Sequence, residues 1–214
     1  MAIHFPFRRN AHQPTGIFRR KAHILVHITD IGVDFMKKAV PYWQMGGFIF
    51  TAAVGTLLHF LFDWTGGSPA AALFSAVNES IWEHLKLLFY PMVAVAVVAY
   101  FFWGKEVEAF WCIKLLGILL GLALIVVVYY TYTGALGVKA DWFNITLFFL
   151  AAAAAYWTET KWLQRQNTCR IRPKLAVALL CLMAVLFTVF TFAPPRIPLF
   201  QDPVTGSYGF FQTK

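Results

Sequence analysis

Long apolar runs, separated by short polar turns, decide what this chain can fold into. No residue between Lys38 and Asp63 carries a formal charge. Because an α-helix rises about 1.5 Å per residue, roughly 20 apolar residues cross a hydrocarbon core about 30 Å thick. Of the 214 residues, 59% are hydrophobic and 13% are charged, against roughly 45–50% and 25% in soluble domains. We therefore expect an integral membrane protein rather than a soluble protein with a large core.

The same runs predict an all-α fold, a polytopic transmembrane helical bundle over residues 42–195. Ser68-Pro69 is a typical helix start, and a helical pattern follows from there to about residue 103. Since that pattern is too long for one span, we expect residues 69–78 to be re-entrant or interfacial. Five spans are predicted, at about residues 42–62, 79–103, 111–133, 142–158 and 175–193.

Residues 1–41 are predicted to form a basic arm followed by an amphipathic interfacial helix. At 100° per residue, His23, His27, Asp30 and Asp34 share one narrow face of that helix. Their spacing fits a two-turn metal site. It also fits the water-facing side of a helix that lies on the membrane surface, which is the interpretation we favour.

Basic residues predict the orientation. The formal net charge is +8, and the arm, the 104–110 turn and the 159–174 loop fall on one side if the spans alternate. By the positive-inside rule that side is cytoplasmic, which puts the amino terminus inside and the carboxyl terminus outside. We expect a multi-pass membrane protein. Its expected partners are the lipid bilayer, anionic lipid at the cytoplasmic face, and a membrane-protein partner or a second copy, with no nucleic acid.

Three cysteines, Cys112, Cys169 and Cys181, are far apart in the chain and form no CxxC motif. Because the cysteines are odd in number and widely spaced, a disulfide framework and a structural zinc site are not expected. The sequence therefore predicts neither a disulfide framework nor a zinc site built on these cysteines.

Polar residues gather where the first two spans should meet at the outer face. His59 and Asp63 are four apart and share a helix face, and Glu79, Glu83 and Lys86 follow an i, i+4, i+7 pattern. Ionisable groups near membrane spans are costly without partners, water or a metal. The candidate ligand-binding residues are His59, Asp63, Asn78, Glu79, Glu83, His84 and Lys86.

Within this set, His59, Asp63, Glu83 and His84 offer imidazole and carboxylate ligands for a divalent metal such as zinc, iron or manganese. The same groups could relay protons or bind a polar lipid headgroup. They could also be structural, as an interfacial ion-pair ladder with a His59–Asp63 hydrogen bond. The sequence has no HExxH motif, no glycine-rich phosphate loop and no GxSxG motif, so catalytic residues stay unassigned.

Two stretches carry a resemblance to a known family: HFLFDWTGG at 59–67 and FSAVNESIWEHLK at 74–86. Together with the tail from Pro194 to Gly209, they resemble an uncharacterised integral-membrane family found mainly in Firmicutes, a domain of unknown function. The resemblance would cover about residues 42–210. It implies a multi-pass protein of the bacterial cytoplasmic membrane and supplies no activity.

Three functions remain open. The chain could bind a polar ligand, an ion or a lipid headgroup at the outer cluster. It could be a metal-dependent intramembrane enzyme that uses His59, Asp63, Glu79, Glu83 and His84. It could be a structural subunit of a membrane complex, with the alanine run at 151–155 as a contact surface. Turn-forming pairs in the tail, residues 196–214, also predict a segment that folds back over the outer cluster or lies at the interface.

Overall fold

The computed structural model describes the backbone of residues 16–137, 140–165 and 169–210, and side chains from Lys38 onward. By internal contacts the chain forms two units, Met1–Lys38 and Ala39–Lys214. Helix α1 runs from Gly16 to Trp64, so the helix predicted over residues 22–38 is not the separate element that the sequence suggested. Its predicted polar face, with His23, His27, Asp30 and Asp34, lies outside the described side chains.

All regular elements of the described residues are helical. Besides α1 they are α2 (Pro69–Ala72), α3 (Ile81–Phe102), η1 (Gly104–Glu106), α4 (Phe110–Leu136), α5 (Asp141–Gln164), α6 (Pro173–Phe192) and η2 (Pro198–Phe200). This confirms the all-α fold class. The second, third and fifth predicted spans agree with α3, α4 and α6 to within a few residues, whereas the first lies inside the longer α1 and the fourth ends six residues before α5 does.

Four helical segments of the described chain are long and apolar enough to cross a membrane: Lys38–Trp64, Ile81–Phe102, Phe110–Leu136 and Pro173–Phe192. Helix α5, the predicted fourth span, is not among them. It is long enough, with 24 residues or about 36 Å, but Asp141, Glu159 and Lys161 lower its apolar character. Four spans are therefore supported by length and composition, and the fifth remains a prediction.

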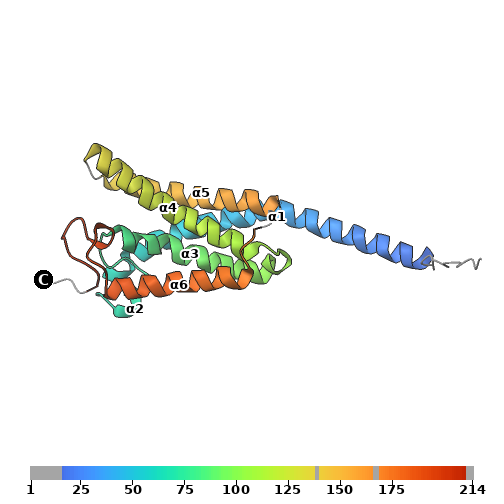
Figure 1. The fold of residues 1–214 in the computed structure, drawn as a ribbon, viewed down its shortest axis with the longest axis horizontal. Helices are drawn as coiled ribbons and strands as arrows, with labels where there is room; N and C mark the ends of the chain where they lie inside the picture. Colours follow the sequence, from blue (N-terminus) through green and yellow to red (C-terminus); the bar gives the residue numbers. More distant parts are fainter. Residues whose placement is uncertain (1–15, 138–139, 166–168, 211–214) are drawn as a thin grey trace, which may run out of the picture. The chain divides into compact units, whose positions relative to one another are not determined.

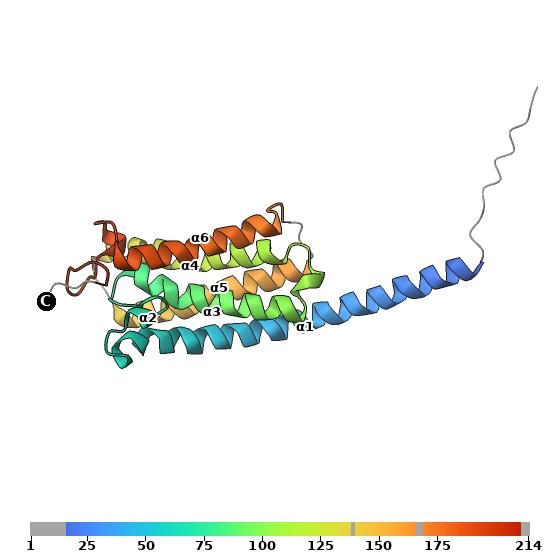
Figure 2. The same ribbon diagram turned by 90° about the horizontal axis from the view of Figure 1, so that it is seen from below.

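Within Ala39–Lys214, helix α4 packs against α3, α5 and α6, and α3 also packs against α6 (Figures 1 and 2). Half of the apolar window of α3, and half of that of α4, is buried. Alanines 151, 152 and 155 of α5 are buried in the same core, where Ala155 and Ala151 lie beside Gly121 of α4. These three alanines thus serve close helix packing inside the chain.

The α1 segment of this unit packs more lightly, with 17% of its apolar window buried. Two glycines bring it close to its neighbours. A Cβ on Gly47 would lie 2.8 Å from the Tyr156 ring of α5, and one on Gly55 would lie 2.6 Å from the carbonyl oxygen of Leu87 in α3. No side chain fits at either position without a shift, so α1 is positioned by close backbone approach and by the polar contacts described below.

The segment between α1 and α3 corrects the prediction of a continuous helical pattern from residue 69. Helix α2 ends at Ala72, and α3 begins only at Ile81. Ser80 is the N-cap of α3, and its hydroxyl accepts a hydrogen bond from the Glu83 N–H at 3.4 Å. Asn78 supports this cap, because its Oδ1 accepts from the Ser80 N–H at 2.9 Å. Side chains that compete for backbone donors break helices and start new ones.

The tail folds back against the ends of α3 and α6. The Phe210 N–H donates to the Thr191 carbonyl at 2.7 Å, and the Asn78 amide donates to the Gly209 carbonyl at 3.2 Å. Gly209 has φ +64° and lies so close to Thr191 that a Cβ would be 2.7 Å from its carbonyl oxygen. A tight turn around Asp202, whose Oδ1 accepts from Val204 at 2.8 Å, completes the segment.

The cysteine prediction is wrong in one respect. Cys112 and Cys169 form a disulfide, with Cα atoms 6.1 Å apart, and Cys181 is free and exposed. Sequence spacing could not show this, because the pairing joins the start of α4 to the connection between α5 and α6. Antiparallel α4 and α5 bring those two places to the same end of the bundle.

Candidate functional site

The structure gathers three of the predicted residues into one group, here called the His–Glu–His cluster: His59, Glu79 and His84. Each offers one ligand atom, and these atoms all lie within 4.8 Å of one another. His59 comes from the last turns of α1, Glu79 from the segment before α3, and His84 from the first turn of α3. The two imidazole centroids are 5.2 Å apart, and Glu79 is exposed.

The hydrogen bond of His84 fixes which of its nitrogens faces the cluster. Its Nδ1 lies 2.9 Å from the Ser80 carbonyl oxygen. Since a carbonyl oxygen only accepts, Nδ1 carries the proton in this contact. In the neutral ring Nε2 then has a free lone pair, and it lies 3.4 Å from Glu79 Oε2. A cation placed between these two electron-pair donors would be attracted by both.

Two other predicted residues, Glu83 and Lys86, belong to a second, fully buried group, here called the Glu83 cluster. Lys86 Nζ lies 2.5 Å from Glu83 Oε2 and donates to the Ala72 carbonyl at 2.8 Å. Thr191 of α6 donates to Glu83 Oε1 at 2.9 Å. The cluster ties α3 to α2 and α6, so Glu83 is turned away from the imidazoles.

The predicted i, i+4, i+7 face is therefore wrong for Glu79, because Glu79 precedes the Ser80 cap and is not helical. Asn78 binds backbone, as described above, and holds the tail against α3. Asp63 is exposed one turn after His59 and is not part of the group whose ligand atoms converge. Six of the seven predicted residues thus divide into a cluster open at the surface, a buried ion pair and a backbone clamp, and the seventh, Asp63, lies exposed outside all three.

A third polar group was missed by the sequence analysis. Lys114 of α4 lies 2.6 Å from Glu159 Oε2 of α5 and donates to Gln44 Oε1 of α1 at 2.7 Å. Gln44 in turn donates to Glu159 Oε2 at 2.8 Å. All three side chains are buried. We call them the Lys114 network.

A signal for the network was present in the sequence. Lys114 is the one formal charge between Phe110 and Leu136, and a charge inside an apolar span needs a partner. Glu159 was assigned to a loop, whereas α5 continues to Gln164. Glu159 reaches Lys114 because position 117 is glycine; a Cβ there would overlap the Glu159 carboxylate.

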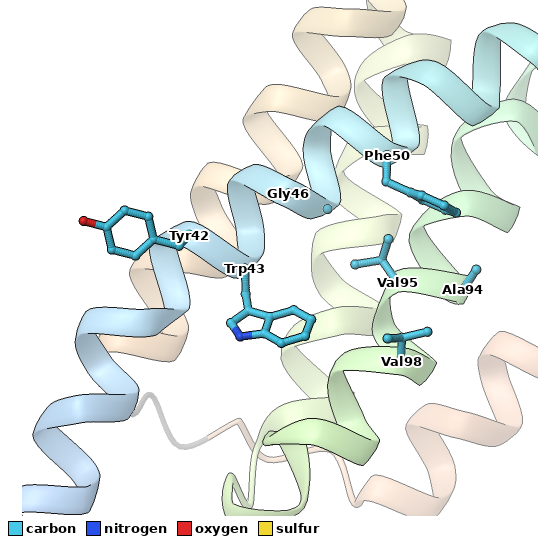
Figure 3. Close-up of a pocket in the computed structure, with 8 residues that line it drawn as sticks. Tyr42, Trp43, Gly46, Phe50, Ala94, Val95 and Val98 are labelled. Atoms are coloured by element: carbon cyan, nitrogen blue, oxygen red, sulfur yellow. The ribbon is translucent and has the colours of Figure 1, made fainter.

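An apolar groove of about 440 Å³ lies between α1 and α3 (Figure 3). Phe50, Val95 and Val98 line it, while the Tyr42 ring points away from the other labelled side chains. Its walls are almost entirely apolar, so it offers a polar ligand very few hydrogen-bond partners. The His–Glu–His cluster is the better candidate for specific chemistry.

Comparison with known proteins gives one match. The model of a family of unknown function, DUF6512, matches residues 35–210. This confirms the expectation that the chain resembles an uncharacterised family. No curated protein and no solved structure matches. The chemistry of the site therefore has to be inferred from its own residues.

Proposed function

We propose that this chain, which belongs to DUF6512, a family of unknown function, is a multi-pass membrane protein that binds a divalent transition metal ion at the His–Glu–His cluster. The observation that carries the proposal is the convergence of three ligand atoms within 4.8 Å of one another. Two imidazoles and a carboxylate are the ligand set of many zinc sites. The ion would be bound by His59, Glu79 and His84.

One of the three ligand spacings fits a tetrahedral ion. With metal–ligand distances of about 2.0–2.2 Å, two ligands of a tetrahedral zinc ion are roughly 3.3 Å apart. The distance from His84 Nε2 to Glu79 Oε2 is 3.4 Å. Ligating histidines usually donate their other ring N–H to a carbonyl or a carboxylate, as His84 does to Ser80. Three protein ligands would leave one position for water or a bound group.

The proposed membrane arrangement has five spans, with α5 as the fourth. Its exposed apolar residues, among them Trp142, Leu150 and Trp157, suit a lipid-facing surface. We call the end that carries the α3–α4 and α5–α6 connections the basic end. Its exposed cations favour a cytoplasmic location in a bacterial membrane, with anionic lipid as a partner and the His–Glu–His cluster outside. They are Lys105, Lys161, Arg165, Arg170, Arg172 and Lys174.

Cysteine accessibility tests this topology. In a Cys181→Ser background, cysteines placed singly at Gly67, between α1 and α2, and at Val204, in the tail, should be labelled by a membrane-impermeant maleimide added to whole cells. A cysteine at Lys105 should be labelled only after the membrane is permeabilised. Labelling of positions 67 and 204 from opposite sides would contradict the four spans, an even number, that the proposal places between them.

Metal binding is tested by titrating the purified, chelator-treated protein with Zn²⁺. We expect one tight site per chain from the cluster, and a double change of His59→Ala and His84→Ala should weaken it by more than about 100-fold, since even outer partners of metal ligands are worth 10–100-fold. The matched control is Asp63→Asn, on the same helix end but outside the converging group. It should retain the affinity within a few-fold.

The arm residues His23 and His27 are present in every variant, so the difference between variants reports the cluster alone. Equal zinc affinity in the wild type and the double variant would overturn the proposal. So would loss of affinity in Asp63→Asn with the histidine variants unaffected.

A further inference from the structure

We propose that the Cys112–Cys169 disulfide is a reversible thiol–disulfide exchange site, whose substrate is a dithiol that approaches from the basic end. Nothing in the metal proposal requires this, and the two can fail separately. The inference stands on where the two sulfurs lie, how unequally they are exposed, and which charges surround them.

The two cysteines occupy different surroundings. Cys112 is fully buried and is the third residue of α4, which begins at Phe110. Cys169 is half-buried, in the connection that leads from α5 to α6. A reagent that reaches the disulfide from outside therefore meets the Cys169 sulfur first.

Because Cys112 is buried and Cys169 is the sulfur that is attacked, Cys112 is the sulfur that leaves. The first turn of a helix presents unsatisfied N–H groups and the positive end of the helix dipole. Thiolates are favoured at helix amino termini and beside basic side chains. Attack on Cys169 therefore releases Cys112 as the leaving thiolate, in the first turn of α4.

Charge favours the approach of an anionic reactant. The exposed residues Arg170 and Arg172 follow Cys169 within three positions, and Arg165 directly follows α5 at the same end. Together with Lys161 they outnumber the acidic Glu106 and Glu108 near the start of α4. A thiolate that enters from this side is attracted by the surrounding cations.

The reaction balances in two steps. One thiolate of the dithiol attacks Sγ of Cys169, which forms a mixed disulfide and breaks the bond to Cys112 Sγ. The second thiol of the dithiol then attacks the dithiol sulfur that is bonded to Cys169. This step closes the cyclic disulfide and releases the Cys169 thiolate. Two electrons pass from the dithiol to the chain, the dithiol becomes a cyclic disulfide, and its two protons end on the two cysteines or in water.

The proposed cytoplasmic location of the basic end agrees with this chemistry. Stable structural disulfides are rare in the cytosol, where dithiol proteins reduce exposed ones. A disulfide that is accessible through one sulfur belongs to the labile class there. It would open and close with the redox state, and in its closed form it ties the α5–α6 connection to α4.

The test uses the full chain with Cys181→Ser, reconstituted in nanodiscs of phosphatidylethanolamine and phosphatidylglycerol. After treatment with millimolar dithiothreitol, the protein is quenched in acid, denatured and labelled with a maleimide that shifts its mobility. We expect both remaining cysteines to be labelled after dithiol treatment of the folded protein and neither before it. Two results would overturn the proposal. One is labelling of both cysteines without reductant, even after oxidation with diamide, and the other is reduction of the disulfide only in denaturant.

Single-cysteine variants test the order of attack. Cys112→Ser leaves Cys169, and Cys169→Ser leaves Cys112, both in the Cys181→Ser background. In the folded protein, Cys169 should form a mixed disulfide with oxidised glutathione at least about tenfold faster than Cys112, because exposure and basic surroundings control thiol reactivity. Equal rates, or a faster Cys112, would contradict the assignment of Cys169 as the attacked sulfur.

Discussion

Replacing Lys114 with methionine is expected to lower the free energy of unfolding by about 3–5 kcal/mol, the usual loss when one partner of a buried ion pair is removed. The change leaves the Glu159 carboxylate fully buried with the Gln44 amide as its one remaining hydrogen-bond partner among the described residues. Oε1 of Glu159 already has no hydrogen-bond partner there, so it cannot compensate. Unfolding by SDS in mixed micelles measures the difference.

Stepwise removal of the network separates the cost of a lone charge from the cost of lost packing. Adding Glu159→Leu to Lys114→Met should recover most of the stability, because replacing both members of a buried pair is often close to neutral. Gln44 then loses both partners, at a residual cost of about 1–3 kcal/mol, which Gln44→Leu should remove.

The matched control is Lys174→Met, which changes the same residue type at an exposed position and should shift stability by less than about 0.5 kcal/mol. A Lys114→Met protein as stable as this control would show that the Lys114 network contributes nothing to the fold. A double variant no more stable than Lys114→Met would show that packing, rather than the lone charge, determines the loss.

Replacing Lys86 with methionine should have an effect of similar size, about 3–5 kcal/mol, for a second reason as well. Lys86 neutralises Glu83 and also satisfies the carbonyl of Ala72 at the end of α2. Its loss therefore leaves a buried carboxylate uncompensated and releases the segment between α1 and α3. Proteolysis of that segment in detergent and SDS unfolding both report the change.

Glu83→Gln combined with Lys86→Met should be tolerated, because the glutamine oxygen can still accept from the Val77 N–H, which donates to Glu83 Oε2 at 3.2 Å, while the glutamine NH2 can donate to the Thr191 hydroxyl beside the other position. The folded double variant should bind zinc as the wild type does, since neither side chain belongs to the His–Glu–His cluster. If it folds and has lost zinc binding, Glu83 is part of the metal site and the division into two clusters is wrong.

Much of the fold could be predicted because hydropathy and helix boundaries follow the same local rules. Apolar runs gave the long helices, and the polar turns gave their ends. The segment from Pro69 to Ser80 was misjudged because its outcome depends on competition: the Ser80 and Asn78 side chains bind backbone groups that a helix would need. A helical periodicity in the sequence does not show whether the backbone groups bond within a helix or to these side chains.

The location of the candidate site could be predicted from the sequence, but the contacts of its side chains could not. The sequence indicated the meeting of α1 and α3, and His59 and His84 do lie together there. It could not show that Glu79 turns toward the imidazoles while Glu83 turns inward, since that depends on where the Ser80 cap starts α3. The Lys114 network and the Cys112–Cys169 pair join residues far apart in sequence, and such pairings follow only from how the helices pack.

Anomalous diffraction data, collected at the zinc absorption edge from crystals of the zinc-loaded protein, test the central claim most directly. The account predicts a peak about 2.0–2.2 Å from nitrogens of His59 and His84 and from an oxygen of Glu79, absent in the His59→Ala/His84→Ala variant. A zinc-loaded protein whose peak lies elsewhere, or whose two imidazoles have density for a lipid headgroup between them, would contradict it.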